Sequence, residues 1–359
     1  AQGNNPALQQ YRPAAGLDHM GDECDELPPY SQRPEWSDIT PVPQDDGTEP
    51  LVVIRYPPGF VEVHDYFRAI QQRTEFSNRA LQLTADVIEH NSANYTAWYY
   101  RRRCLKELGS DLGAELIFTD KWSRDCPKNY QVWYHRRWLI TEIAEHLRAT
   151  GSDQAKVEEQ IRQLAEREVE YHLDTMQTND DYKNYNGWSH RQFIVQKFDL
   201  WAAELEFVED LLRDDVRNNS AWNHRYTIVR KTKWPLTDKS RQQEIDFTLT
   251  ALRKCVNNES AWNYLGAFLG EGPDKVPWDS MPVVESFCRE VLASAPEPEK
   301  SCRFAVEALA RVHEARGEVA EGLNHYALLK TIDKIRASYW DWRAALLSQK
   351  TATVAAAAS

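Results

Sequence analysis

The chain has 359 residues, of which 42% are hydrophobic and 27% charged, a composition typical of a globular protein with a sizeable core. Asp and Glu outnumber Lys and Arg by 55 to 43, and the net charge of −12 argues against non-specific nucleic-acid binding, because an acidic surface repels phosphates. No apolar stretch reaches the roughly 18 residues that a membrane span needs, so we expect no stable membrane insertion.

Residues 1–58 are expected to form a proline-rich arm that is extended or partly disordered. Ten of the 17 prolines lie here, with Gly, Asp and Gln between them. Such a segment buries too little apolar surface to offset the entropy lost on ordering. Tyr30, Trp36, Ile39 and the run Leu51-Val52-Val53-Ile54 are the residues expected to anchor the last part of the arm to the body.

Residues 59–349 are predicted to form a domain of helical repeats. Apolar residues recur there at helical spacing, and five segments carry an Asn four residues before a Trp, with Trp-to-Trp spacings of 35, 55, 34 and 40. The five tryptophans are Trp98, Trp133, Trp188, Trp222 and Trp262. A period near 34 fits two helices and their turns, the unit of an α-solenoid. The sequence therefore predicts an all-α fold of about seven helical hairpins.

Each position of the repeat has a structural explanation. The Asn caps the following helix, and the Trp is buried against neighbouring helices. An Arg three residues after the Trp, present in all but the fifth repeat, is expected to stack on or hydrogen-bond to the next repeat. His135, His190 and His224 share one phase and are interpreted as packing residues rather than catalytic imidazoles.

Two regions depart from the regular spacing. The interval of 55 residues holds about 20 additional residues around 145–165, which we expect to lengthen one hairpin around a turn at Gly151-Ser152-Asp153. Beyond residue 265, helices are expected near 280–294, 300–316, 320–336 and 338–349. Residues 350–359 are expected to be a disordered alanine-rich tail.

Two lysines are not explained by the repeat. Lys128 and Lys183 each precede an Asn-Tyr pair at a predicted helix start, where a cation opposes the helix macrodipole by about 0.3–1 kcal/mol. Two neighbouring helix N-termini, each with a lysine and a tyrosine hydroxyl, would suit a phosphate group. The alternative is a pair of solvated surface lysines.

The residues provide no complete catalytic apparatus. Dinucleotide-binding, P-loop, zinc-protease and nucleophile-elbow motifs are all missing. Six dispersed cysteines without a C-x-x-C pair suit free thiols in the cytoplasm, and Cys126 with His135 is too small a set for a metal site. No metal is expected in this chain, and a non-catalytic tetratricopeptide-like scaffold is one interpretation, although the W-x₂-L-G-x₂-Y pattern of that family is missing.

The repeats nevertheless resemble a known family. The segments 129–137, 216–223 and 258–264 are similar to the α subunits shared by protein farnesyltransferase and protein geranylgeranyltransferase type I, as are 36–47 in the arm and 65–69. The resemblance is dense over 34–270. It implies a crescent-shaped, right-handed superhelix that wraps a β subunit in an obligate heterodimer, with Zn²⁺ in that β subunit and Mg²⁺ with the diphosphate.

The family transfers a farnesyl or geranylgeranyl group from its diphosphate to the cysteine of a C-terminal CaaX motif. By resemblance, Lys128 and Tyr185 are the catalytic candidates, and both contact the prenyl diphosphate together with Tyr130 and Asn186. Asn186 replaces a histidine that is frequent in the family. Peptide contacts are implied for the set Tyr95, Tyr130 and Gln131. The α subunit of Rab geranylgeranyltransferase is an alternative. The proline-rich arm and the closer match of the repeat sequences to the farnesyltransferase and geranylgeranyltransferase type I family count against it.

Overall fold

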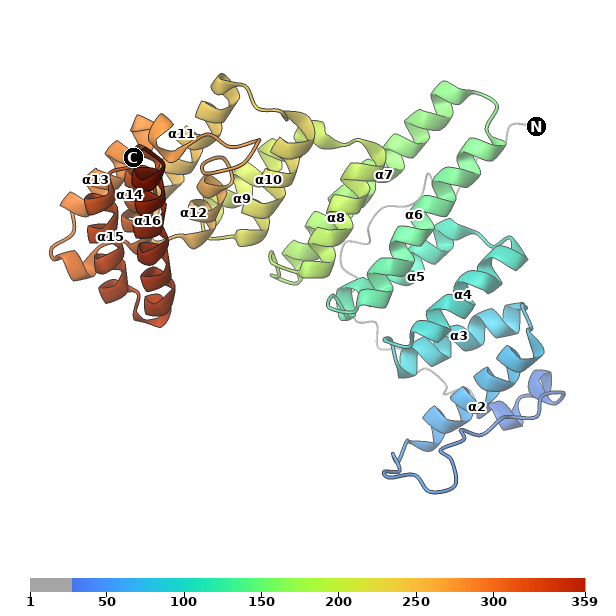
Figure 1. Cartoon of the computed structure of the whole chain (residues 1–359). Helices are drawn as coiled ribbons and strands as arrows, with labels where there is room; N and C mark the ends of the chain where they lie inside the picture. The colour runs from blue at the N-terminus through green and yellow to red at the C-terminus, as the bar shows by residue number, and fades with distance from the viewer. Residues whose placement is uncertain (1–27, 359) are drawn as a thin grey trace. The chain divides into compact units, whose positions relative to one another are not determined.

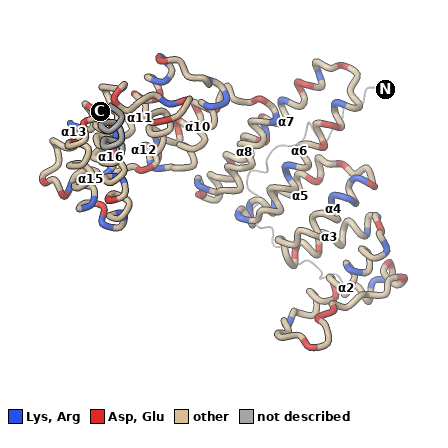
Figure 2. The backbone as a smooth tube through the Cα atoms, viewed as in Figure 1, with Lys and Arg blue, Asp and Glu red and all other residues tan. Residues whose placement is uncertain are grey.

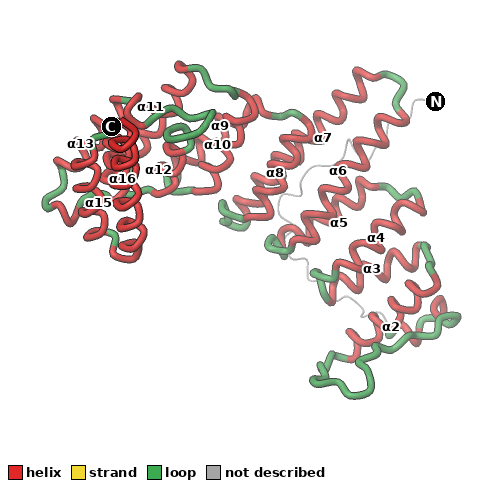
Figure 3. Tube along the Cα trace, viewed as in Figure 1, coloured by secondary structure: helices red, strands yellow, loops and turns green. Residues whose placement is uncertain are grey.

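The computed structural model describes residues 28–358, with side chains up to Gln349. Figure 3 shows helices joined by loops, and over the described residues the β-structure is limited to one isolated bridge between Leu269 and Val276. The predicted all-α fold is therefore confirmed. The chain divides after Leu200 into two compact units.

The first unit contains two short 3₁₀ turns and α2 to α8 (Figure 1). Successive helices run in opposite directions and pack side by side. The elements are η1 (Tyr30–Gln32), η2 (Pro34–Trp36), α2 (Pro58–Arg73), α3 (Asn78–His90), α4 (Tyr95–Leu108), α5 (Leu112–Asp125), α6 (Tyr130–Thr150), α7 (Gln154–Thr178) and α8 (Tyr185–Phe198).

The second unit continues the same architecture through α16. Helices appear in each of the four stretches expected beyond residue 265, but α16 continues to Ala358, through residues for which the sequence predicts a disordered tail. The elements are η3 (Trp201–Ala203), α9 (Glu204–Asp214), α10 (Asn219–Thr232), α11 (Asp238–Lys254), α12 (Glu259–Gly266), η4 (Trp278–Ser280), α13 (Pro282–Ala293), η5 (Pro298–Lys300), α14 (Arg303–Arg316), α15 (Val319–Ile332), η6 (Lys334–Arg336) and α16 (Ala337–Ala358).

The repeated Asn caps its helix in all five repeats. Each side-chain oxygen accepts a backbone N–H of the first turn at 2.9–3.2 Å. These bonds satisfy donors that a helix start leaves without a partner. The caps are Asn94, Asn129, Asn184, Asn218 and Asn258.

The repeated Trp is buried in all five repeats, with between 0 and 6% of its surface exposed. Each indole N–H donates to the carbonyl six residues earlier, at 2.7–2.9 Å. In three cases the same carbonyl also accepts the amide of the capping Asn in the next repeat. A single carbonyl thus joins consecutive repeats, which explains why Asn and Trp recur together.

The repeated Arg has a partner that the sequence analysis missed. Arg101 donates to Glu115 of α5, which also bonds His135 of α6, and Arg136 uses Glu168 of α7 in the same way. Carbonyl contacts exist, but Arg101 reaches Leu81, in an earlier helix and not in the next repeat. The stacking is confirmed, since the Arg101 guanidinium lies 3.8 Å from the centroid of the Phe118 ring on the following helix, α5, but the principal hydrogen-bond partner there is a carboxylate and not a carbonyl.

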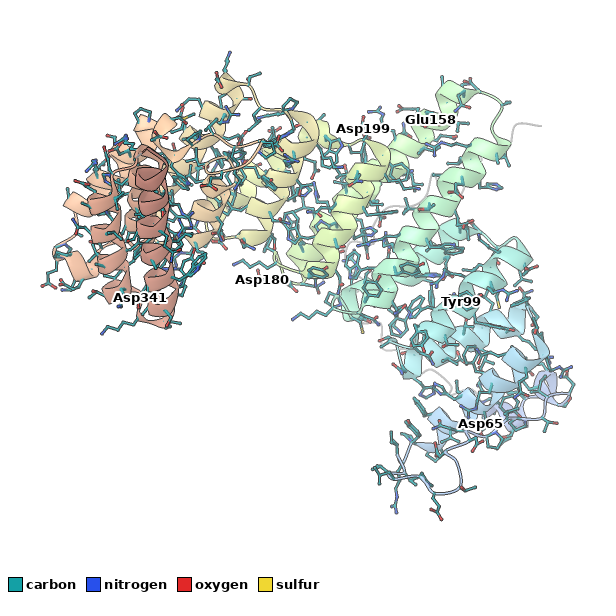
Figure 4. The ribbon with its side chains drawn as sticks, viewed as in Figure 1. Asp65, Tyr99, Glu158, Asp180, Asp199 and Asp341 are labelled. Carbon is teal, nitrogen blue, oxygen red and sulfur yellow. The ribbon has the colours of Figure 1, made fainter. Side chains whose placement is uncertain are left out.

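Two further expectations have opposite outcomes. In the arm, Tyr30, Trp36 and Ile39 are buried against α2 and α3, but Leu51-Val52-Val53-Ile54 is 62–101% exposed, so its expected anchoring role is wrong. The long hairpin is confirmed: α6 and α7 extend beyond their neighbours, and Glu158 and Asp180, labelled in Figure 4, lie near opposite ends of α7. Residues 1–27 lie outside the described residues.

Candidate functional site

Lys128 lies in the turn between α5 and α6 and is exposed. The turn is fixed at each of its carbonyls. Pro127 O accepts the Trp133 indole at 2.8 Å and the Asn184 amide at 3.2 Å, and Lys128 O accepts the Asn186 amide at 3.0 Å. The lysine side chain therefore extends from a backbone that the start of α8 holds in place.

Asn186 holds the turn that carries Lys128, a role that the resemblance did not suggest. Its side-chain nitrogen is committed to the Lys128 carbonyl, so that nitrogen donates within the chain and fixes the neighbouring turn. The bond also shows that the second helix start of the predicted pair lies beside the first. Lys183, which precedes that second start, is exposed.

Tyrosines begin three of the helices in the first unit. Tyr95, Tyr130 and Tyr185 are the first residues of α4, α6 and α8, and they are 70%, 57% and 81% exposed. Gln131, next to Tyr130, is half-buried. Tyr130 and Tyr185 directly follow the caps Asn129 and Asn184, and the bond from Asn186 to Lys128 O holds these two helix starts side by side, so both tyrosines lie at the Lys128 end of the unit. Tyr95 belongs to the preceding hairpin.

Sequence reasoning missed two further exposed tyrosines, one helical turn after Tyr95 and Tyr130. Tyr99 and Tyr134 follow Tyr95 and Tyr130 by one turn and are 54% and 46% exposed. Residues four apart share a helix face, so the spacing was a usable signal. Tyr130 and Tyr134 stack with their ring centroids 6.3 Å apart. The exposed aromatic surface therefore continues along α4 and α6.

Two arginines complete that face. Arg102 and Arg137 follow the tyrosines by another turn, and burial lowers the pKa of both guanidinium groups. Arg102 lies 5.0 Å from the centroid of the Tyr134 ring on α6. Arg137 likewise reaches across to α8 and donates to Ser189 Oγ at 2.8 Å. Both are half-buried and have cationic groups beside phenols.

The buried histidines do not form a reactive centre. His135 and His190 are fully buried, and each bonds a glutamate that is also paired with an arginine. His224 bonds Glu204 in the second unit at 2.5 Å. Burial lowers the pKa of His135 and His190, against the opposing effect of their glutamates. These groups hold neighbouring helices together and do not reach a substrate, as the packing interpretation requires.

No cluster of ligands for a metal occurs in the part of the chain that the structure describes. Its His, Cys, Asp and Glu side chains nowhere converge in groups of three or more. The described cysteines are free thiols. None of the helices from α2 to α16 combines the length and hydropathy that crossing a membrane requires. The described side chains at the Lys128 turn offer cations, amides and phenols, groups that bind anions.

Comparison with known proteins identifies the repeat. The model of the "Protein prenyltransferase alpha subunit repeat" matches residues 77–108, 112–143, 201–232 and 241–271. Each match covers a pair of helices of which the second carries the repeated Trp, and the unmatched segment 144–200 contains the end of α6, all of α7 and all of α8.

Whole proteins with this repeat are also similar. The chain is 50% identical over 99 residues to a protein farnesyltransferase/geranylgeranyltransferase type-1 subunit α from pea (Pisum sativum), an alignment that spans 28% of this chain and 30% of the relative. The corresponding protein from Candida albicans is 30% identical over 318 residues, covering 88% of this chain and 97% of the relative.

A solved structure agrees with these alignments. A chain of Candida albicans protein geranylgeranyltransferase-I complexed with GGPP superposes with a TM-score of 0.73 at 29% identity. The match covers 87% of this chain and 98% of that one. The similarity thus extends across both units of the chain.

Proposed function

The chain belongs to the family of protein farnesyltransferase/geranylgeranyltransferase type-1 α subunits, and from this membership we propose that it is the α subunit of a heterodimeric protein prenyltransferase. The observation that carries the proposal is the alignment along 97% of the Candida albicans relative. The partner is a β subunit, and the chain is inactive without it. We place the enzyme in the cytoplasm.

The proposed reaction joins a prenyl group to a cysteine of a C-terminal CaaX motif. The bond between C1 of the farnesyl or geranylgeranyl group and its diphosphate oxygen breaks, and a thioether bond forms between C1 and the cysteine sulfur. The thiol loses its proton, and diphosphate leaves. Zn²⁺ in the β subunit supplies thiolate activation, and Mg²⁺ supplies charge neutralisation at the diphosphate.

Lys128 supplies the main catalytic contribution of this chain in the proposal. Negative charge grows on the diphosphate as the C1–O bond breaks, so a fixed cation stabilises the transition state more than the ground state. The hydrogen bonds to Pro127 O and Lys128 O support this role, because they fix the turn before substrate binds. Tyr130 and Tyr185 are assigned as hydroxyl donors to the diphosphate.

Asn186 and the N-terminus of α8 complete the proposed diphosphate contacts. One N–H of the Asn186 amide donates to Lys128 O, and the second N–H and the N-terminus of α8 are assigned as donors to the diphosphate oxygens. Gln131 and Tyr95 are assigned to the peptide, with Tyr130 shared between the two substrates. The exposure of Tyr95 and Tyr130 supports contact with molecules outside this chain.

The choice of protein substrate tests the proposal. The chain is co-expressed with a type-I β subunit or a farnesyltransferase β subunit, and prenyl transfer is measured to a CaaX peptide and to a Rab protein with its escort protein. We expect transfer to the CaaX peptide. Transfer only to the Rab protein would favour the Rab geranylgeranyltransferase alternative, and no transfer from a stable complex would favour a non-catalytic scaffold.

A further inference from the structure

One residue at the start of α8 differs from its counterparts in the other repeats. The position before the repeated Trp is an apolar residue with a side chain in four repeats and Gly187 in the third. The four counterparts, all fully buried, are Ala97, Val132, Ala221 and Ala261. Glycine is less favourable in a helix than any residue except proline, so its presence here needs a local cause.

The cause is a close approach between α7 and α8, which lie side by side (Figure 1). A Cβ at position 187 would lie 2.9 Å from Nε2 and 3.1 Å from Cδ2 of His172. Ordinary van der Waals contacts of a Cβ begin at 3.4 Å, so a methyl group here requires the two helices to separate by about half an ångström. Gly187 lies within an ordinary α-helix, so the limit is space and not backbone conformation.

The His172 ring has little freedom to make room. It is fully buried, and it packs edge-on against two indoles, with ring centroids 6.5 Å from Trp133 and 6.0 Å from Trp188. The cavity beside His172, Trp133 and Gly187 measures about 10 Å³, which is room for one water at most. A ring packed in this way resists displacement, so a methyl group at position 187 would move the start of α8 instead.

The start of α8 carries the contacts that fix the Lys128 turn. Asn186, which precedes the glycine, donates to Lys128 O at 3.0 Å, and Asn184 donates to Pro127 O at 3.2 Å. A shift of about half an ångström brings such bonds to the limit of hydrogen-bonding distance. The fit of Gly187 against α7 therefore determines how firmly the turn is held.

Charged side chains of these segments offer no second way of holding the lysine. Residues 126–138, from the turn into α6, and all of α8 contain no Asp or Glu, and their traces in Figure 2 carry no red. A carboxylate of these two segments therefore cannot pair with Lys128. The position of the lysine depends on the backbone of its turn, and hence on the helix start that holds this backbone.

We propose that Gly187 is a positioning residue for Lys128. Because it has no side chain, the His172 ring fits beneath the start of α8, and this close approach keeps Asn186 bonded to Lys128 O. The inference rests on the proposed function, since it takes Lys128 as the cation that acts on the diphosphate. A side chain at position 187 displaces the lysine turn and leaves the binding of substrates and of the β subunit in place.

The test adds that side chain. Gly187→Ala is made in the full chain and assembled with a type-I or farnesyltransferase β subunit, and single-turnover prenyl transfer to a CaaX peptide is measured. We expect the rate to fall by about two- to twelvefold, as for loss of the Asn186 bond, with little change in the affinities for prenyl diphosphate and for the β subunit. Gly266→Ala is the matched control, because a Cβ at this helical glycine of α12 meets nothing within 4 Å.

Two further backgrounds show whether the effect passes through the proposed contacts. In the His172→Ala background, Gly187→Ala should change the rate little, because the ring that the methyl group would meet is gone. In the Asn186→Ala background it should also add little, since the bond to Lys128 O is already lost. The second comparison does not depend on the folding of the His172 variant.

The outcomes separate positioning from packing and from the proposed function. An unchanged rate for Gly187→Ala would overturn the inference, as would an equal fall in rate in the Asn186→Ala background. A fall in rate that accompanies a lower melting temperature and weaker binding of the β subunit would also overturn it, because it would show a general loss of packing. A wild-type complex that transfers no prenyl group to the CaaX peptide would contradict the proposed function itself.

Discussion

At the scale of single residues, the central feature is a lysine on a prearranged turn. An exposed lysine normally samples many conformations, and ordering it costs entropy. Here the backbone of the turn is already fixed by Trp133, Asn184 and Asn186 before any ligand arrives. The bonds from Trp133 and Asn184 recur at the turns of other repeats, and the bond from Asn186 to Lys128 O is the one that is particular to this turn.

Replacing Lys128 by alanine is predicted to slow the chemical step. The rate of single-turnover prenyl transfer by the heterodimer should fall by about 10²-fold, with little change in prenyl diphosphate affinity, because the contact strengthens as charge develops on the leaving group. Lys156→Ala is the control, since Lys156 is 82% exposed at the far end of the long hairpin. An unchanged single-turnover rate would remove Lys128 from the mechanism.

Asn186 is predicted to act through Lys128. Asn186→Ala removes a hydrogen bond of about 0.5–1.5 kcal/mol, so kcat should fall by roughly two- to twelvefold. In the background of Lys128→Ala the same substitution should have little further effect, because the group that it positions is gone. Equal effects in both backgrounds would show that Asn186 acts independently of Lys128.

At the scale of elements, the repeated unit is an arginine, a glutamate and a histidine from three consecutive helices. Burial favours an uncharged Glu168, but Arg136 and His190 outweigh it and lower the pKa of Glu168 to about 2. Burial also lowers the pKa of His190 below its ordinary value of 6.5, although Glu168 acts in the opposite direction. The histidine is therefore a neutral donor to the glutamate at pH 7.

The stability of the fold should consequently fall in acid. The unfolded chain protonates His190 below about pH 6.5, and the folded chain does so only at a lower pH, so the free energy of unfolding decreases as the pH falls below 6.5, by at most about 1.4 kcal/mol per pH unit for one histidine. Glu168 adds a loss between pH 4.5 and about 2, in the same direction. His190→Gln keeps an N–H donor without this titration.

Thermal melts between pH 7.5 and pH 5 measure this dependence. We expect the His190→Gln variant to lose less stability than the wild type over that interval, with part of the slope retained because burial also lowers the pKa of His135. Parallel pH dependences for the two proteins would contradict the assignment of His190 as a buried neutral group.

The tryptophans are predicted to be the main packing residues of the repeat. Trp133 is 1% exposed, so Trp133→Ala should lower the free energy of unfolding by about 3–5 kcal/mol. Trp342→Ala is a matched control, because Trp342 is 56% exposed and its loss should change stability by about 0.5 kcal/mol or less. Chemical denaturation followed by circular dichroism checks both values, and equal stabilities would show that Trp133 is not part of the core.

Sequence reasoning succeeded where the spacing is local. The cap and the Trp lie four residues apart in every repeat, so their roles could be inferred from one helix turn. The glutamates that pair with the repeated arginines could not be inferred in this way. Glu115, Glu168 and Glu244 lie 14, 32 and 19 residues after their arginines, with no constant spacing. The exposed run 51–54 failed for another reason: a short apolar segment does not itself specify a partner, and the described chain provides none.

At the scale of the whole molecule, the described chain combines a scaffold of packed helices with a candidate site that lies on its surface. Lys128 and its tyrosines are arranged on a surface, and the described residues offer no group of ligands for a metal. Hydrophobic residues make up 42% of the chain, and many of them are buried between neighbouring helices. In the proposed enzyme, the β subunit supplies the pocket for the prenyl chain and the zinc that activates the thiolate.

Reconstitution from separate subunits tests this division most directly. Prenyl transfer to a CaaX peptide is measured with the purified chain alone, with the β subunit alone and with both at equal concentration. We predict transfer only when both are present, at a rate that saturates at one chain per β subunit. Transfer by this chain alone, or a stable complex of both subunits that transfers nothing, would contradict the proposal that it lends Lys128 to its partner's diphosphate site.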